Sequence, residues 1–224
     1  MFIAGTDTDV GKTMVTVALI KYLRTVGVDA VGLKPVCCGV REDAEKIQYA
    51  NTLNGGVLHS IDSINPVYLT EPAAPASIAQ ANVPPLQEVL DQIHMVETEF
   101  QIVEGAGGWL VPVCHEWDME ALAVQCGHPV LLVVSNRLGA LNHAALTAQA
   151  IRATGLPLVG FVLNTIAPSS YPLAQQTNLK VLEELLDCPC LAAITPGGNP
   201  ASSQILNERL KIQTQEDLPL LFAP

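Results

Sequence analysis

Four runs of aliphatic residues in the second half of the chain are apolar on both faces, and they limit the possible folds more than any other feature. The runs are "FQIV" (100–103), "PVLLVV" (129–134), "LPLVGFVL" (156–163) and "CLAAI" (190–194). A strand with one wet face alternates apolar and polar residues, whereas continuously apolar strands are typical of parallel sheets covered on both faces. The pattern therefore predicts a buried parallel sheet.

The first half of the chain continues the alternation of strands and helices. "FIAG" (2–5) and "AVGLKPV" (30–36) are predicted strands, and Pro35 closes the second one. Predicted helical segments cover 12–27, 43–56, 85–99, 118–127, 140–155 and 177–187. Residues 60–85 are rich in proline and are expected to form an irregular excursion. Right-handed crossovers then favour a single α/β domain, residues 1–224, with a doubly wound, mostly parallel sheet flanked by helices.

Composition excludes several classes of partner. The formal net charge is −11 with only 11 Lys and Arg, so no basic face for a nucleic acid is expected. The most apolar run, residues 129–134, is too short to cross a membrane. Met1 leads directly into a strand-like segment without a basic leader, and we expect a cytoplasmic protein.

Six cysteines show no C-x-x-C pair, which favours reduced and mostly buried thiols in a cytoplasmic protein. Cys188 and Cys190 are an alternative pair of metal ligands, although no second pair lies near them in the sequence.

The segment "GTDTDVGKT", from Gly5 to Thr13, lies between the first predicted strand and the first predicted helix. Glycines let the backbone N–H groups wrap around a phosphate, and the helix that follows adds the positive end of its dipole. Lys12 supplies a charge for the β- and γ-phosphates, and Thr13 supplies a hydroxyl for Mg²⁺. The loop has five residues between its glycines instead of four, which indicates a subclass of phosphate loop. A tight turn with an incidental Gly-Lys-Thr is the alternative.

Two carboxylates follow predicted strands and are candidate Mg²⁺ ligands. Glu104 ends a buried strand and precedes "GAGG", where an unpaired charge would be costly. Asp43 follows the second strand, and a metal ligand or an ordinary helix N-cap both fit its position.

Lys34 ends the second predicted strand in "GLKPV". A lysine that extends into solvent is one interpretation. The other is that Lys34 emerges at the same sheet edge as the phosphate loop. Two lysines and a metal ion would suit a phosphoryl acceptor that is itself an anion, because cations must then neutralise both partners.

Together, "GTDTDVGKT", "KPV", "VEGAGGWLVPV", "LGALNHAALT" and "LNTIAP" resemble the dethiobiotin synthetase family, which has a phosphate-loop NTPase fold. The motifs cover residues 5 to about 199, nearly the whole chain. The resemblance implies that 7,8-diaminononanoate, CO₂ and ATP are substrates. One amine becomes a carbamate, the carbamate attacks the γ-phosphate, and the second amine closes the ureido ring, releasing ADP and phosphate. It also implies Mg²⁺ and a homodimer.

The resemblance also assigns residues to roles. Lys12 and Lys34 are the expected electrostatic catalysts, and Thr13, Asp43 and Glu104 the expected Mg²⁺ ligands. The expected ATP-binding residues are Asp9, Val10, Gly11, Lys12, Thr13, Met14, Asp43, Glu104, Gly105, Ala106, Gly107, Asn164, Thr165, Gly197, Gly198 and Asn199. The expected substrate-binding residues are Cys38, Gly139, Ala140 and Asn142. His143 is expected to be structural.

Three positions depart from the family pattern. Cys38 stands where the family commonly has serine, and Thr165 stands where an acidic residue is frequent. The family's partner-subunit tyrosine has Tyr171 nearby, but Gln176 occupies its aligned place.

Two other classes compete with a synthetase. A partition or targeting ATPase of the same fold group usually has an extra lysine early in the loop, and "GTDTDV" has none. An amidotransferase-type synthetase needs a glutaminase domain, for which 224 residues leave no room.

Overall fold

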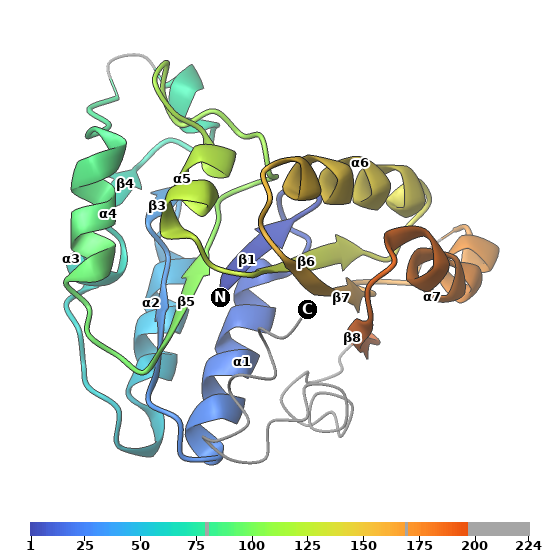
Figure 1. Ribbon diagram of the computed structural model, residues 1–224, viewed down its shortest axis with the longest axis horizontal. Helices are drawn as coiled ribbons and strands as arrows, with labels where there is room; N and C mark the ends of the chain where they lie inside the picture. The colour runs from blue at the N-terminus through green and yellow to red at the C-terminus, as the bar shows by residue number, and fades with distance from the viewer. Residues whose placement is uncertain (79–80, 169, 197–224) are drawn as a thin grey trace.

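The computed structural model of the chain describes residues 1–78, 81–168 and 170–196. Within them, six strands form one parallel sheet: β1 (Phe2–Gly5), β2 (Ala30–Leu33), β5 (Phe100–Glu104), β6 (Val130–Ser135), β7 (Leu158–Asn164) and β8 (Cys190–Ile194). Their order in the sheet is β2-β5-β1-β6-β7-β8 (Figure 1). The predicted parallel α/β sheet is confirmed.

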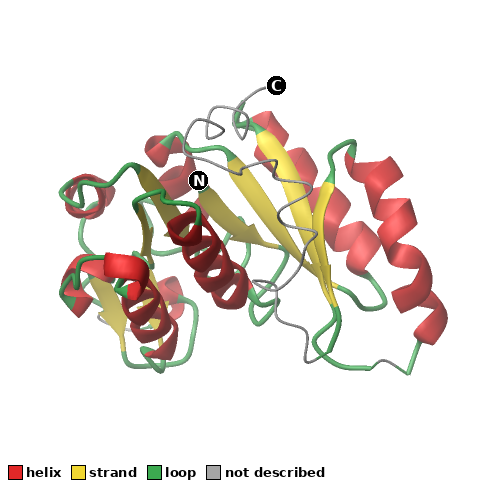
Figure 2. Ribbon diagram, turned by 90° about the horizontal axis from the view of Figure 1, so that it is seen from below, coloured by secondary structure: helices red, strands yellow, loops and turns green. Residues whose placement is uncertain are grey.

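Helices flank the strands on both sides (Figure 2). The helices of four or more residues are α1 (Lys12–Thr25), α2 (Glu42–Asn51), α3 (Ile61–Ile64), α4 (Leu86–His94), α5 (Met119–Cys126), α6 (Ala140–Ala153) and α7 (Pro172–Leu186). The helices α1 and α2 contact each other and β2, and α6 and α7 contact each other beside β6 to β8. The chain passes from β1 through α1 to β2 in one direction, and from β6 through α6 to β7 in the other. In such a sheet, ligands bind at the carboxyl ends of the strands near this reversal.

Several element boundaries differ from the predicted ones, and α4 ends at His94 although the prediction extended to residue 99. The helix α7 begins five residues before residue 177, because Pro172 suits a first helical position, where its missing N–H is not needed. The helix α2 begins at Glu42 and ends at Asn51. A separate 3₁₀ turn, Leu53–Gly55, follows it, with Asn54 in the left-handed region at φ 50°.

The segment after β2 forms a second sheet that the sequence did not predict. Two short parallel strands, β3 (Val36–Cys38) and β4 (Val67–Leu69), pair outside the main sheet. The prediction that 30–36 is one strand is therefore wrong. The prediction that residues 60–85 are irregular is wrong in part, since they contain α3, β4 and the 3₁₀ turn Pro75–Ser77. Pro35 has no N–H to continue the β2 ladder, and three-residue strands are too short to show a period.

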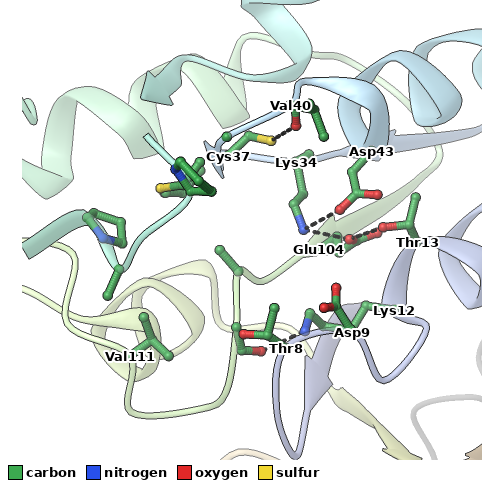
Figure 3. A pocket seen from close by; sticks show the side chains of 18 of the residues that line it. Thr8, Asp9, Lys12, Thr13, Lys34, Cys37, Val40, Asp43, Glu104 and Val111 are labelled. Carbon is green, nitrogen blue, oxygen red and sulfur yellow. Dashed lines mark hydrogen bonds and ion pairs between the residues drawn. The ribbon is translucent and has the colours of Figure 1, made fainter. Parts of the chain in front are cut away.

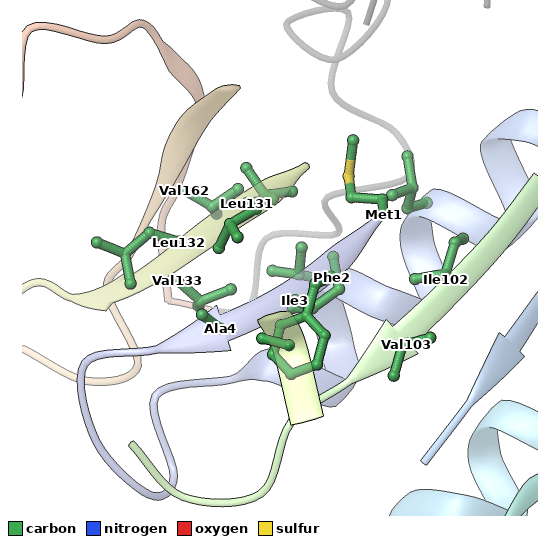
Figure 4. Close-up of a cluster of buried hydrophobic side chains, with 14 of the residues drawn as sticks. Met1, Phe2, Ile3, Ala4, Ile102, Val103, Leu131, Leu132, Val133 and Val162 are labelled. Carbon is green, nitrogen blue, oxygen red and sulfur yellow. The ribbon is translucent and has the colours of Figure 1, made fainter. Parts of the chain in front are cut away.

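The core lies around the three central strands (Figure 4). Buried side chains of β1 pack with those of β5 and β6, and the set includes Met1, Phe2, Ile3, Ile102, Val103, Leu131, Leu132 and Val133. The rings of Phe2 and Trp109 also pack in a T-shaped arrangement, with their centroids 6.1 Å apart. Burial on both faces explains why these strands show no polar alternation.

Side chains occupy the outer edge of β2, where no strand of the described residues pairs. Arg24 Nη1 donates to the Ala30 carbonyl at 2.8 Å. The Asn51 amide pairs with both backbone groups of Gly32: its oxygen accepts from the N–H at 2.8 Å, and its nitrogen donates to the carbonyl at 3.0 Å. Asn51 is fully buried, so these bonds replace a missing strand partner.

Candidate active site

The loop between β1 and α1 has the shape that its sequence predicts. Asp9 and Gly11 are in the left-handed region, at φ 56° and 96°. A Cβ atom on Gly11 would lie 2.3 Å from Asn164 Nδ2, so a side chain is excluded there both by φ and by space. The Asn164 amide donates to the Val10 carbonyl at 2.9 Å and holds the loop against the end of β7.

Lys12, the first residue of α1, extends back along this loop. Its buried ammonium donates to the carbonyls of Asp7 at 2.9 Å and Gly107 at 2.7 Å. Burial, and then the positive charge of Lys34, lower the pKa of Lys12 to about 8. A negatively charged phosphate in the loop would relieve both effects.

Glu104 and Lys34 form a buried ion pair at the ends of β5 and β2. Glu104 Oε1 accepts from Lys34 Nζ and from Thr13 Oγ1, each at 2.7 Å, and Glu104 is 0% exposed. Asp43 lies 3.7 Å from Lys34 Nζ on the other side (Figure 3). Burial alone would lower the pKa of Lys34, but the charges of Glu104 and Asp43 outweigh it and raise that pKa above its ordinary value.

The alternative interpretation of Asp43 as a helix N-cap is wrong. The N-cap of α2 is Arg41, whose side chain makes no cap hydrogen bond, and Asp43 is the second helical residue. Its carboxylate is directed instead toward Lys34 (Figure 3). The interpretation of Lys34 as a lysine that extends into solvent is also wrong, because its side chain is 5% exposed.

The oxygens around Lys34 fit a hard divalent cation. Glu104 Oε2 is buried without a hydrogen-bond partner in the described part of the chain, although such atoms are costly to leave unpaired. Mg²⁺ takes one or two carboxylates, together with water and phosphate oxygens. Glu104, Asp43 and the Thr13 hydroxyl supply that type of set. Among the described residues, no three His, Cys, Asp or Glu side chains gather to form a self-sufficient metal site.

A cavity of about 1080 Å³ opens beside this cluster. Its walls come from the phosphate loop, the start of α2, the β3–β4 sheet and the segment after β5 (Figure 3). The predicted site residues that line it are Asp9, Gly11, Lys12, Thr13, Lys34, Cys38, Asp43, Glu104, Ala106 and Gly107. The β3–β4 wall also brings Tyr68, Thr70 and residues 72–75 to the cavity, and the sequence reasoning missed these. The β-branched and aromatic "VYL" was the available signal.

Other predicted residues do not line the cavity. Val10 is buried in the loop, and Met14 lies beside Gly11. The N–H of Gly105 donates to the Ile3 carbonyl at 3.1 Å. Thr165 Oγ1 accepts from the Asn136 amide at 3.0 Å.

The start of α6 holds Gly139, Ala140 and Asn142, and none of the three lines the cavity. An ion pair of 3.2 Å between Arg137 and Asp7 joins the segment before α6 to the phosphate loop. Gly197, Gly198 and Asn199 lie outside the described residues.

None of the six cysteines, all of which lie in the described residues, forms a disulfide bond. Only Cys37 and Cys190 are buried and the other four are half-buried, so the expectation of mostly buried thiols is wrong. Burial raises the pKa of Cys38 to about 11, which keeps this cavity-lining thiol protonated. No helix in the described residues is long and apolar enough to span a membrane.

Residues 1–198 match the protein family described as an AAA domain, AAA_26. The chain is 36% identical over 213 residues to the ATP-dependent dethiobiotin synthetase BioD of Akkermansia muciniphila, which covers 93% of this chain and 97% of the relative. It is 41% identical over 201 residues to the BioD of Nitrosospira multiformis, covering 86% of each. The cell division ATPase MinD of Pyrococcus furiosus has a similar fold, with a TM-score of 0.56 at 18% identity over 98% of each chain.

Proposed function

The chain belongs to the ATP-dependent dethiobiotin synthetase family, and on this premise we propose that it makes dethiobiotin from 7,8-diaminononanoate, CO₂ and ATP. The observation that carries the proposal is the convergence of Lys12, Lys34 and the Glu104 carboxylate on one cavity. The reaction needs such cations, because a carbamate anion must approach a negatively charged γ-phosphate. The proposal treats residues 1–224 as one synthetase domain.

The nucleotide phosphates bind in the loop from Asp9 to Met14. Backbone N–H groups and the start of α1 contact the phosphates, and Lys12 leaves its two carbonyl partners to face the β- and γ-phosphates. Gly105, Ala106 and Gly107 approach the nucleotide from the end of β5. Asn164 ends β7 and Thr165 follows it, and we propose that both contact the base. Gly197, Gly198 and Asn199 are further proposed ATP-binding residues.

Lys34 stabilises the phosphoryl transfer. A carbamate oxygen attacks the γ-phosphorus and ADP leaves, which gives a carbamic–phosphoric anhydride. The second amine then attacks the carbonyl carbon, and phosphate leaves as the ureido ring closes. Lys34 emerges between the loop and the β3–β4 wall, where its charge can face both the carbamate and the transferred phosphoryl group.

Thr13, Asp43 and Glu104 are the proposed Mg²⁺ ligands. The unpartnered Glu104 Oε2 supports this assignment. When bound, Mg²⁺ neutralises phosphate charge and orients the γ-phosphate for displacement. Lys34 contacts the same two carboxylates that would hold the metal.

We propose that the diamine lies along the β3–β4 wall beside Cys38, and that Gly139, Ala140 and Asn142 hold its carboxylate, for which the Ala140 N–H would exchange its 3.1 Å bond to the Arg137 carbonyl. Since these three residues do not line the cavity of their own chain, the carboxylate site is completed in a homodimer. Exposed apolar side chains on and beside α6 and α7 support such an interface: Leu138, Leu146, Tyr171 and Leu173 are each more than half exposed. Cysteines without disulfide bonds suit the proposed cytoplasmic location.

The test is a balanced turnover experiment. Purified protein is incubated with Mg²⁺, ATP, the diamine and ¹³C-bicarbonate, and both ADP and the cyclic urea are quantified by mass spectrometry. One ADP per labelled urea is expected, with no ADP release when the diamine is omitted. The competing function is that of a switch ATPase, because the fold of this chain is similar to that of MinD. ADP release without the diamine, and no labelled urea, would favour the switch.

A further inference from the structure

The side chain of Asn65 holds the corner where the chain leaves the main sheet. Asn65 is 1% exposed. Its Nδ2 lies 2.7 Å from the Lys34 carbonyl, 3.0 Å from the Val67 carbonyl and 3.4 Å from that of Pro35. The Lys34 N–H donates to the Ile64 carbonyl at 2.9 Å. Both backbone groups of Lys34 are therefore held by the segment that leads into β4.

The guanidinium of Arg41 holds Asn65 in turn. Arg41 Nε donates to the Asn65 side-chain oxygen at 2.9 Å, and Nη2 donates to the Asn65 carbonyl at 2.8 Å. Nη2 also contacts the exposed Asp62 carboxylate at 2.7 Å. The guanidinium lies over the Tyr68 ring at 4.8 Å from the centroid. Arg41 is the N-cap residue of α2, and its carbonyl accepts from the N–H of Glu45 at 3.1 Å.

These contacts join two backbone segments that carry site residues. Asn65 fixes the segment of Lys34, and Arg41 fixes the start of α2, where Asp43 follows two residues later. The bond between Arg41 and Asn65 links the two, while the reactive ends of Lys34 and Asp43 lie 3.7 Å apart. Neither Arg41 nor Asn65 is among the residues that line the cavity.

We propose that Arg41 and Asn65 form a positioning pair, in which Asn65 sets the place of Lys34 and Arg41 sets the place of Asp43. The inference rests on the proposed function, because it assigns Lys34 to phosphoryl transfer and Asp43 to Mg²⁺. Electrostatic catalysis depends steeply on placement, and a displacement of about 1 Å can cost 10²-fold in rate. The buried polar corner therefore serves the chemistry as well as the fold.

Asn65→Asp tests the first half of the pair. The carboxylate has nearly the size of the amide and still accepts from Arg41, but it cannot donate to the Lys34 carbonyl. Diamine-dependent kcat should fall at least ~10-fold, about 1.4 kcal/mol. Binding of ATP without Mg²⁺, measured with a fluorescent nucleotide, should change less than ~2-fold, because the phosphate loop is untouched. An unchanged kcat in the folded variant would overturn this half.

Arg41→Met tests the second half and is better tolerated, since the Arg41 side chain is 19% exposed. The Mg²⁺ concentration for half-maximal turnover should rise at least ~5-fold, and kcat at saturating Mg²⁺ should stay within ~3-fold of the wild type. Asp62→Asn is the matched control, because it removes only the charge of the exposed partner of Arg41. Ile151→Val, in the buried face of α6, controls for lost stability. Both controls should keep the wild-type Mg²⁺ midpoint, and an equal rise in either control would overturn the proposal.

Double variants separate positioning from an independent role. If Asn65 acts through Lys34, Lys34→Ala/Asn65→Asp should be no slower than Lys34→Ala alone. By the same reasoning, Arg41→Met/Asp43→Asn should have the Mg²⁺ midpoint of Asp43→Asn. If Lys34→Ala and Asp43→Asn are each impaired and the second substitution still multiplies the loss, the positioning pair is overturned and the proposed function is not. Normal turnover in Lys34→Ala would instead overturn the role of Lys34 in the proposed function.

Discussion

Replacing Glu104 with glutamine should destabilise the ligand-free protein and weaken its use of Mg²⁺. Glutamine keeps the size of the side chain and one oxygen, but it removes the charge. In the wild-type protein that charge lies 2.7 Å from Lys34 Nζ, with Glu104 fully buried and the Lys34 side chain 5% exposed. The variant leaves a buried ammonium with one remaining carboxylate, Asp43, at 3.7 Å and 47% exposed.

The magnitude follows from this geometry. Removing one partner of a buried ion pair typically costs about 3–5 kcal/mol. Asp43 offsets part of the loss, so we expect about 3 kcal/mol. For a chain of this length each kcal/mol lowers Tm by about 2–4 °C, which gives a decrease of about 6–12 °C. In the variant, burial dominates and lowers the pKa of Lys34, so the penalty should shrink as the pH rises and Lys34 becomes neutral.

Two assays measure the effect. Thermal unfolding without ligands gives the loss of stability, and product formation at increasing Mg²⁺ gives the metal requirement. The phosphate loop and Lys12 remain, so ATP should still bind, and turnover should fall at limiting Mg²⁺ and recover in part at high Mg²⁺. Glu120→Gln is the control: Glu120 accepts from Trp109 Nε1 at 2.7 Å, and a neutral amide can still accept that bond.

Either of two results would refute this reasoning. A Glu104→Gln variant with a Tm within about 2 °C of the wild type would mean that the ion pair with Lys34 contributes little. A wild-type Mg²⁺ midpoint would mean that Glu104 is not a ligand, and Asp43 and water would then have to hold the metal.

Four further predictions concern single residues. Lys34→Ala should bind ATP nearly normally but lose at least ~10²-fold in turnover, because its charge acts mainly in the transition state, and near-normal turnover would remove it from the chemistry. Cys38→Ser should be tolerated and tighten diamine binding, since a hydroxyl is the better hydrogen-bond partner; a loss of tenfold or more, about 1.4 kcal/mol, would show that the thiol is needed. Gly11→Ala should weaken ATP binding at least ~10-fold in a titration, because a Cβ would lie 2.3 Å from Asn164 Nδ2 at φ 96°; unchanged affinity would show that the loop adjusts. Burial, and then the positive N-terminus, lower the pKa of His128 to about 4, so the folded state binds fewer protons than the unfolded state between pH 4 and 6.5. The free energy of unfolding should therefore fall as the pH drops through that range. His128→Gln should lessen this fall, measured by urea unfolding at pH 7.5 and pH 5, and an unchanged difference would exclude His128 as its source.

The sequence located the centre of the candidate site because strand ends are readable. Lys34 and Glu104 each follow an apolar run, and Lys12 follows a glycine loop. Carboxyl ends of parallel strands meet at one edge, so these residues had to lie close together once the sheet was predicted. The structure confirms that they do.

The surroundings of the site could not be read in the same way. The wall formed by β3 and β4 consists of strands of three residues each, and so short a segment carries no periodic signal. The direction of Asp43 depends on where the chain leaves the sheet, which local patterns do not specify. The same holds for Asn65 and Arg41, since a polar residue in a predicted excursion gives no sign that it is buried.

The outer edge of β2 has a consequence for how the protein behaves among other chains. An unpaired strand edge can template the addition of a foreign strand, which leads to aggregation. Several backbone groups along that edge are already bonded: the Ala30 carbonyl by Arg24, both groups of Gly32 by Asn51, and the Lys34 carbonyl by Asn65. The side-chain amides of Asn51 and Asn65 therefore occupy backbone groups with which a strand of a misfolded neighbour would have to pair. They hinder growth of the sheet at this edge, where no strand of the described residues covers it.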